Sequence, residues 1–359
     1  RIQSKETRMR SIISLSANLR INSWLTVQAR GSVDYISDKM RQKFYASTAP
    51  ALCGANGRYI EMDYQETLIY GDVMAMGKRK WEDFALDVAI GGSINDKNVN
   101  STRYDSKNAS LKYANVFNLA NIVMNGSASI DQKIDSRRQL QSVFGTAQVG
   151  YQDKVFLDLT ARNDWASTLA YTSHEKSGFF YPSAGLSFLI DKWIQLPEWI
   201  SFAKLRGTYS KVGNDIPQFI TNSVSHITAG GELQANDAAP FKEMEPEMTH
   251  SVEVGTEWRF FQSRLGFNLT YYRTNTHNQF FKLPALAGDM YAYRYVNAGD
   301  IQNRGWELTV DATPVLTPDF TWKTSLNFSS NRNKIKELHE ELKELVYGPS
   351  SFSSSYAMK

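Results

Sequence analysis

Two short polar motifs are the clearest candidates for chemistry in this chain: Asn163-Asp164-Trp165 and Gly213-Asn214-Asp215. A carboxylate beside an aromatic ring suits ligand recognition, because the ring stacks on an apolar surface while the carboxylate accepts hydrogen bonds. The same residue types also serve structure, since Asn and Asp cap turns and Trp favours the boundary of an apolar layer. Both interpretations therefore stay open for Trp165 and Asp215.

Further aromatic residues lie in or beside predicted loops, where a ring can stack on a sugar or on a peptide side chain. Loops carry binding residues more often than the elements that they connect. The candidate substrate-binding set for an oligosaccharide or peptide ligand is therefore Trp165, Tyr171, Tyr181, Asp215, Phe219, Tyr291 and Tyr293.

Potential metal ligands are present, but their spacing predicts no metal site. Asp237 and the glutamates at positions 243, 245 and 247 could offer oxygen ligands to calcium. Their spacing fits no known calcium loop, so a solvated acidic loop is the preferred interpretation. The histidines also lack the spacing of a zinc site: His226, His250 and His277.

The sequence also lacks the signatures of an enzyme. It contains no Ser-His-Asp, Cys-His or paired-carboxylate pattern and no phosphate-binding loop. Cys53 is the only cysteine, so it can form neither an internal disulfide nor a metal cage, and we interpret it as a bystander thiol. Forty basic residues nearly balance 37 acidic ones, which gives no support to nucleic-acid binding. We predict no catalytic activity, no cofactor and no nucleic-acid partner.

The elements that must position these residues are strands. Apolar and polar residues alternate along 251–260, with Val252, Val254 and Trp258 on one face and Glu253 and Glu257 on the other. The same alternation, or turn residues that bracket it, predicts twelve strands: 9–21, 24–37, 64–76, 82–94, 139–151, 154–165, 179–190, 201–212, 249–261, 264–276, 304–312 and 319–330.

The connections between these strands alternate between short turns and long loops. In an up-and-down sheet this alternation must be strict, and it requires a strand at 64–76 although the pattern there is weak. Strands of about ten residues with long loops on one side are unusual for a soluble sheet. We therefore predict an all-β, antiparallel, up-and-down transmembrane β-barrel region over 1–359, with long loops at about 38–63, 95–137, 213–248, 277–303 and 331–359.

Three further observations support a wall with one lipid face and one polar lumen face. No apolar run approaches the 18 residues of a membrane helix, whereas a transmembrane strand needs only about 9–11 residues. Charged residues occupy the polar phase of the strands, for example Arg30, Asp158 and Glu307. Aromatic residues cluster beside the predicted short turns, as an interfacial girdle requires: Trp24, Trp81, Tyr151, Trp193, Trp199, Phe260, Phe261, Phe320 and Trp322.

Several ordered blocks resemble the SusC/RagA family of TonB-dependent outer-membrane transporters. They include SVFGTAQVGYQDKVFLDLTARNDWASTL (142–169), FFYPSAGLSFLIDKW with LPEWISFAKLRGTYSKVGND (179–215), and a P-E-x-x-x-S-x-E-x-G block within 245–276. The segments 297–315 and 320–338 continue the resemblance, which covers residues 139–338. Residues 1–138 share the general strand pattern of the family but none of these motifs.

This resemblance implies a 22-stranded barrel with an N-terminal plug, energised by TonB, in the cell outer membrane of a Gram-negative bacterium. It also implies import of oligosaccharides or peptides, with a SusD-like lipoprotein as lid. The chain carries about twelve strands and shows no plug, TonB box or signal peptide, so we expect both ends to be cuts through a longer protein.

Two other architectures are also consistent with the strand pattern. The chain could form a self-contained 12-stranded, porin-like outer-membrane barrel, or a soluble all-β ligand-binding protein. Apolar residues at helical spacing predict a short surface helix on the barrel rim, or a contact for the lid protein: Ile335, Leu338, Leu342 and Leu345.

Overall fold

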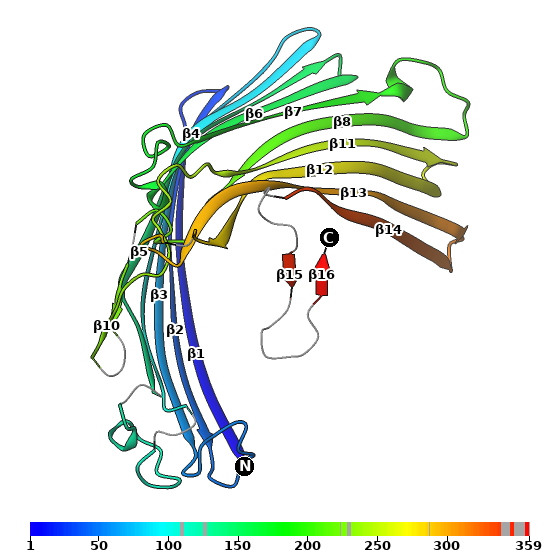
Figure 1. The fold of residues 1–359 in the computed structure, drawn as a ribbon. Helices are drawn as coiled ribbons and strands as arrows, with labels where there is room; N and C mark the ends of the chain where they lie inside the picture. Colours follow the sequence, from blue (N-terminus) through cyan, green and yellow to red (C-terminus); the bar gives the residue numbers. More distant parts are fainter. Residues whose placement is uncertain are drawn as a thin grey trace.

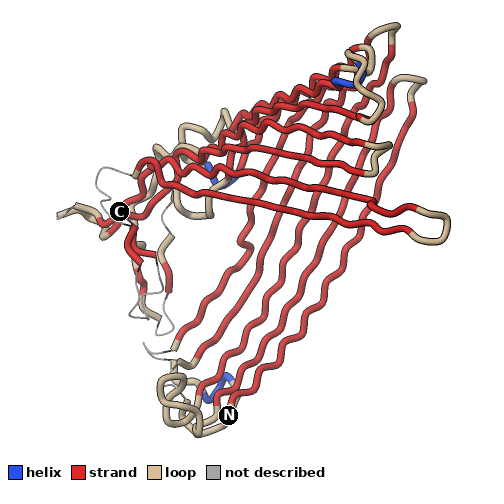
Figure 2. The backbone as a smooth tube through the Cα atoms, turned by 90° about the vertical axis from the view of Figure 1, so that its right-hand side faces the viewer, coloured by secondary structure: helices blue, strands red, loops and turns tan. Residues whose placement is uncertain are grey.

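A computed structural model describes residues 1–107, 111–124, 128–222, 224–227, 231–286, 288–338, 345–347 and 356–358. Twelve antiparallel strands form one curved sheet in chain order (Figures 1 and 2). The sheet strands are β1 (Ile2–Arg20), β2 (Leu25–Phe44), β3 (Arg58–Lys80), β4 (Phe84–Asp105), β5 (Ser129–Tyr151), β6 (Val155–Ala166), β7 (Phe179–Leu189), β8 (Ile200–Asn214), β11 (Glu247–Phe260), β12 (Leu265–Pro284), β13 (Tyr293–Leu316) and β14 (Thr321–Glu337).

All twelve predicted strands are confirmed, including 64–76, which lies inside β3. Most strands are longer than predicted, so the expected loop bounds were wrong at 38–63, 95–137, 277–303 and 331–359. The observed connections are 45–57, 106–128 and 285–292, and β14 continues to Glu337. The reason is that strand pairing continues beyond the apolar alternation, supported by cross-strand ion pairs such as Arg8–Asp38 at 2.6 Å and Arg41–Glu61 at 2.9 Å.

The expected rim helix was also wrong at the positions that the structure describes. Ile335 pairs with Ile301 inside β14, and Leu345 begins β15 (Leu345–Tyr347), which pairs with β16 (Tyr356–Met358). Leu338 follows β14 directly, and Leu342 lies outside the described residues. The segment at Ile335 forms a strand despite the helical spacing of its apolar residues, because the edge of β13 offers backbone hydrogen bonds.

The remaining short elements lie in the connections. The long segment after β8 contains β9 (His226–Ile227) and β10 (Leu233–Gln234), which pair with each other. The described residues also contain three 3₁₀ turns: η1 (Leu119–Asn121), η2 (Ser167–Leu169) and η3 (Ile190–Lys192). Within the described ranges, no helix has the length and apolar character needed to cross a membrane.

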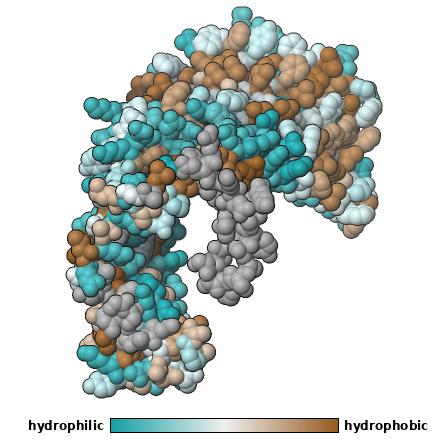
Figure 3. Space-filling model, in the orientation of Figure 1, coloured by the Kyte–Doolittle hydropathy of each residue, from teal (hydrophilic) through white to brown (hydrophobic). Residues whose placement is uncertain are grey.

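The sheet has two chemically different faces. The register places one phase of apolar side chains on the same face from β1 to β14, and we call this the outer face; the opposite, polar face is the inner face. Outer-face residues on fully paired strands stay exposed: Ile90 at 64 %, Val254 at 55 % and Leu186 at 52 %. Apolar side chains gather over the region of β6 to β14 in Figure 3. An apolar surface of this extent requires an apolar environment.

The aromatic girdle predicted beside the short turns is present. Trp193 stacks on Phe188 with ring centroids 5.4 Å apart, and Trp199 stacks on Phe260 at 5.6 Å. Trp24, Trp81 and Trp322 are exposed at the same ends of their strands. Amphipathic rings at one set of strand ends mark the boundary of an apolar layer.

Candidate ligand-facing site on the inner face

The loop-side ends of β5, β6 and β7 place a buried carboxylate on the inner face. Asp164 is 6 % exposed and accepts hydrogen bonds from Arg162 Nε at 2.7 Å and from the hydroxyl of Tyr181. Arg162 Nη2 also donates to Ser142 Oγ at 2.7 Å. Because the carboxylate is paired and hydrogen-bonded, its burial is tolerated, and the cluster is a rigid polar corner rather than a free acid.

A second carboxylate fastens the segment that follows β8. Asp215 accepts a hydrogen bond from Arg138 Nε at 2.7 Å, one from the hydroxyl of Thr168, and one from the backbone N–H of Ile216 at 2.7 Å. Its side chain is 9 % exposed. Asp215 therefore ties three segments of the chain together at the point where β8 ends.

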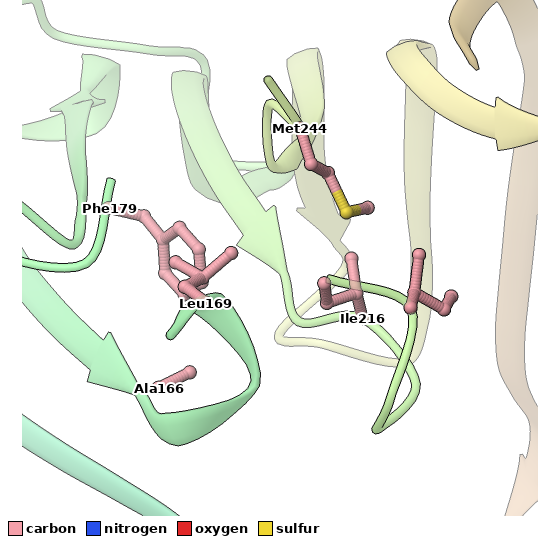
Figure 4. Packing of buried hydrophobic residues seen from close by; sticks show 6 residues of the cluster. Ala166, Leu169, Phe179, Ile216 and Met244 are labelled. Atoms are coloured by element: carbon pink, nitrogen blue, oxygen red, sulfur yellow. The ribbon is translucent and has the colours of Figure 1, made fainter. Parts of the chain in front are cut away.

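An apolar cluster continues this attachment across the inner face. Leu169 and Met244 are fully buried beside Phe179 and Ile216 (Figure 4). The cluster is made by the end of β6, the start of β7 and the segment 215–246, and it packs against further inner-face side chains: Leu140, Tyr181, Phe241, Phe280 and Tyr295. We call the segment 215–246 the inner loop, because its buried residues lie on the inner face.

The far side of the inner loop is held by β12 and β13. Ala238 forms a parallel bridge with Tyr293, and the Tyr293 N–H donates to the Asp237 carbonyl at 2.9 Å. Lys282 Nζ pairs with Asp237 at 2.9 Å and lies 4.2 Å from the centroid of the Tyr293 ring. The hydrogen bond with Asp237 raises the pKa of Lys282, although this pair is exposed. The inner loop thus contacts both halves of the inner face.

The structure divides the seven predicted site residues into four groups, of which the last is Trp165 alone. Tyr171, Phe219 and Tyr293 expose their rings, at 66 %, 57 % and 38 % respectively. Tyr291 is half-buried, as is Tyr181, whose hydroxyl is bound to Asp164. Asp215 is a buried fastening residue of the inner loop.

Trp165 lies on the outer face, opposite to the other candidates on the strands. Its Nε1 donates to the Lys176 carbonyl at 2.9 Å, and its ring lines a shallow apolar groove of about 920 Å³ with Ile94 and Val143. Strict alternation along β6 explains this placement, because neighbours such as Asp164 and Trp165 must point to opposite faces. Asp164 and Trp165 of the Asn163-Asp164-Trp165 motif therefore cannot bind the same ligand from one face of the sheet.

Sequence reasoning missed Arg162 and Arg138, the cations that hold the two carboxylates. A signal was available for Arg162, which precedes Asp164 by two residues and so shares its face. No comparable signal existed for Arg138 and Asp215, which are 77 residues apart. The buried partners of the inner loop were missed for the same reason.

The potential metal ligands remain dispersed. Asp237 pairs with Lys282, Glu245 accepts from Asn278 at 2.7 Å, and Glu247 accepts from Gln279 at 3.0 Å. His250 and His277, far apart in sequence, meet edge-to-face at 5.6 Å. In the part of the chain that the structure describes, no group of three or more His, Cys, Asp or Glu residues could hold a metal ion.

Comparisons with known proteins agree with this geometry. The family described as TonB dependent receptor-like, beta-barrel matches residues 4–343. TonB-dependent receptor P26 of Formosa agariphila is 30 % identical over 210 residues, which is 56 % of this chain and 21 % of that protein. TonB-dependent receptor SusC of Bacteroides thetaiotaomicron is 25 % identical over 218 residues, with the same two coverages. The matched part thus spans about a fifth of the length of these relatives.

A solved structure shows the same fold. The structure of the RagAB peptide transporter superposes with a TM-score of 0.80 at 19 % identity, covering 99 % of this chain and 40 % of that chain. The curated relatives are named as receptors and this structure as a transporter, and none of them is named as an enzyme.

Proposed function

The chain belongs to the TonB dependent receptor-like β-barrel family, and we propose that it forms part of the wall of an outer-membrane nutrient importer. In this proposal the outer face contacts lipid, the inner face lines the path of an oligosaccharide or peptide, and TonB supplies energy through a plug. The two-faced sheet supports the lipid contact, and the family supports the class of function. The complete wall in this proposal is a 22-stranded barrel in the outer membrane of a Gram-negative bacterium.

The inner loop is the observation that carries the ligand-binding part of this proposal. It is fixed to the inner face through Asp215 and Met244, and it carries the exposed ring of Phe219 between Ile216 and Ile220, which are buried in the apolar cluster. Tyr171 and Tyr293 add exposed rings at the same end of the sheet. Rigidly held aromatic rings can stack on a sugar or on a peptide side chain at low entropic cost.

We propose a SusD-like lipoprotein as the partner on the loop side. The loops 45–57 and 106–128 pack together around Tyr59, Leu111 and Ile122, which gives them a small core of their own. Tyr113 and Val116 stay exposed on this folded tip, at 70 % and 43 %. An ordered tip with exposed apolar side chains suits a protein contact.

The binding test uses the Phe219→Ala variant of the full chain, reconstituted in lipid nanodiscs and titrated separately with a pool of oligosaccharides and a pool of peptides. Loss of one stacking ring should weaken binding to one pool by about 1 kcal/mol, or roughly fivefold. Trp193→Ala is the matched control, because it removes an exposed ring at the short-turn end. Equal binding by wild type and Phe219→Ala would show that Phe219 does not contribute to ligand binding.

The two alternatives are tested by different measurements. A self-contained barrel requires β1 to pair with β14, but the described sheet runs from β1 to β14 without such a pairing. Closed barrels resist unfolding by detergent, so heat-modifiable migration of this chain alone would favour that alternative. Recovery of the chain from the soluble fraction, without membrane association, would favour a soluble all-β binding protein and contradict our proposal.

A further inference from the structure

A row of arginines crosses the outer face on β12, β13 and β14. Arg273 pairs in register with Arg304, and Arg304 pairs in register with Arg332. Partners in register point to the same face, so the three arginine side chains leave the sheet in one row, and all three residues are exposed. Arg273 and Arg304 belong to strands that are paired on both sides, whereas Arg332 lies on the last strand of the sheet.

The positive charge of this row is not balanced by carboxylates. Among the described residues, no Asp or Glu lies within ion-pair distance of Arg273, Arg304 or Arg332. Arg273 donates instead to neutral amides: to Asn275 Oδ1 at 3.2 Å and, in the preferred orientation of its amide, to Gln302 at 2.9 Å and 3.0 Å. Like charges in register destabilise a sheet, so this arrangement calls for an external anion.

The next outer-face row adds charge of the same sign. Lys334 pairs in register with Gln302, and Lys211 pairs with His250 on the neighbouring strands β8 and β11. The nearby carboxylate of Asp300 is engaged by Asn275 at 2.8 Å and lies 3.9 Å from His277. The basic side chains therefore outnumber the acidic ones on this part of the outer face.

The row lies at the edge of the apolar layer. Two residues closer to the short turns on the same face of β12 and β13, Tyr271 and Trp306 pack with ring centroids 4.7 Å apart. The following row of outer-face residues toward the short turns is apolar, with Leu269, Leu308 and Phe328 in register. Aromatic rings followed by apolar side chains mark the transition from headgroups to hydrocarbon, so the arginines stand at headgroup level.

The opposite half of the sheet shows a different arrangement at the loop side of its apolar layer. The outer-face row there consists of Ser11, Tyr35, Thr67 and Asn98, followed by Arg137 on β5. Arg137 is neutralised by Asp96, which accepts from its Nε at 2.9 Å. The unbalanced basic row is thus a local feature of β12 to β14 and not a general property of the rim.

We propose that Arg273, Arg304 and Arg332, assisted by Lys334, bind the phosphate group of a membrane lipid headgroup. A guanidinium group matches phosphate geometry with two parallel hydrogen bonds, and three such groups in register fit an anion with several acceptor oxygens. The acyl chains of the same lipid then lie on Leu269, Leu308 and Phe328, below the ring pair. The bound lipid offsets the repulsion within the row and anchors this part of the wall at a fixed depth.

The test measures lipid bound to the full chain by native mass spectrometry from detergent micelles containing phosphatidylglycerol or phosphatidylcholine. The R273Q/R304Q/R332Q variant should bind phosphatidylglycerol at least about tenfold more weakly than wild type at low salt, since each basic residue near an anionic headgroup contributes to affinity. The control variant K204Q/R259Q/K323Q removes the same charge from the inner face and should retain wild-type binding.

Three outcomes would overturn the proposal. Equal loss of binding in both variants would show an effect of net charge alone. Displacement of phosphatidylglycerol by an equal concentration of inorganic phosphate would show an anion site without a lipid component. Binding of an acidic peptide in preference to phosphatidylglycerol would point to a protein partner. Circular dichroism of each variant, compared with wild type, shows whether its β-sheet content is retained, and the two-residue variant R273Q/R304Q replaces the triple variant if that one does not fold.

Discussion

The pair Arg58–Asp105 shows how single residues hold the loop-side rim together. Arg58 Nη2 lies 2.7 Å from Asp105 Oδ2, and the Asp105 side chain is 3 % exposed. Burial alone would raise the pKa of the Asp105 carboxyl, but hydrogen bonds from Arg58 and from the Lys107 N–H outweigh it and lower the pKa. This pair lies at the ends of β3 and β4, beyond the apolar part of those strands.

The first prediction follows from the lowered pKa of Asp105. A carboxyl with a depressed pKa in the folded state contributes stability above its unfolded pKa of about 4, and this contribution is lost as the pH falls through the folded pKa. The loops 45–57 and 106–128 should therefore be cleaved faster by an acid-stable protease as the pH falls below about 4. Asp105→Asn should be cleaved faster already at pH 7, because Arg58 loses its partner, at a cost of about 1–3 kcal/mol.

The exposed pair Lys80–Asp153 provides the control for this measurement. Asp153→Asn removes an ion pair of similar length at a short turn, where both side chains are largely exposed, and should change cleavage of the rim loops little. Identical pH dependence in wild type and Asp105→Asn would contradict the prediction.

At the scale of elements, the sequence predicted the order and pairing of twelve strands but not the ends of those strands or the inner loop. Alternation and parity were sufficient for β3, whose own pattern is weak. The strand ends were missed because ion pairs such as Arg8–Asp38 extend the ladder without apolar alternation. The inner loop was missed because its contacts join residues far apart in sequence, such as Met244 and Leu169, and no local pattern encodes them.

The second prediction concerns the attachment of the inner loop. Met244 is fully buried between this loop and the ends of β6 and β7, so Met244→Ala should destabilise the attachment by about 2–5 kcal/mol. We expect faster hydrogen exchange in 215–246, with little change in the strands of the sheet. Met290→Ala, at a position that is 90 % exposed, should leave exchange unchanged. Uniformly faster exchange across β5 to β8 would instead assign Met244 to the stability of the sheet.

For the whole molecule, the decisive property is the chemical difference between the two faces of one sheet. Residues with adjacent numbers meet opposite environments, as Asp164 and Trp165 show. The buried apolar clusters of the described residues lie at the loop side, while the apolar side chains along the strands point outward. A sheet of this kind is stable when a hydrocarbon layer covers the outer face.

The third prediction tests this property with two neighbouring residues of β6. Leu159 lies on the outer face and is 41 % exposed, whereas Thr160 lies on the inner face and is also exposed. In lipid vesicles, Leu159→Arg should lower the free energy of unfolding by about 2–4 kcal/mol, because the charge enters hydrocarbon, whereas Thr160→Arg should change it by less than about 1 kcal/mol. Denaturant titration followed by tryptophan fluorescence measures both values. A soluble sheet would tolerate the two substitutions equally, so the sign and size of this difference decide whether the outer face is covered by lipid or by water.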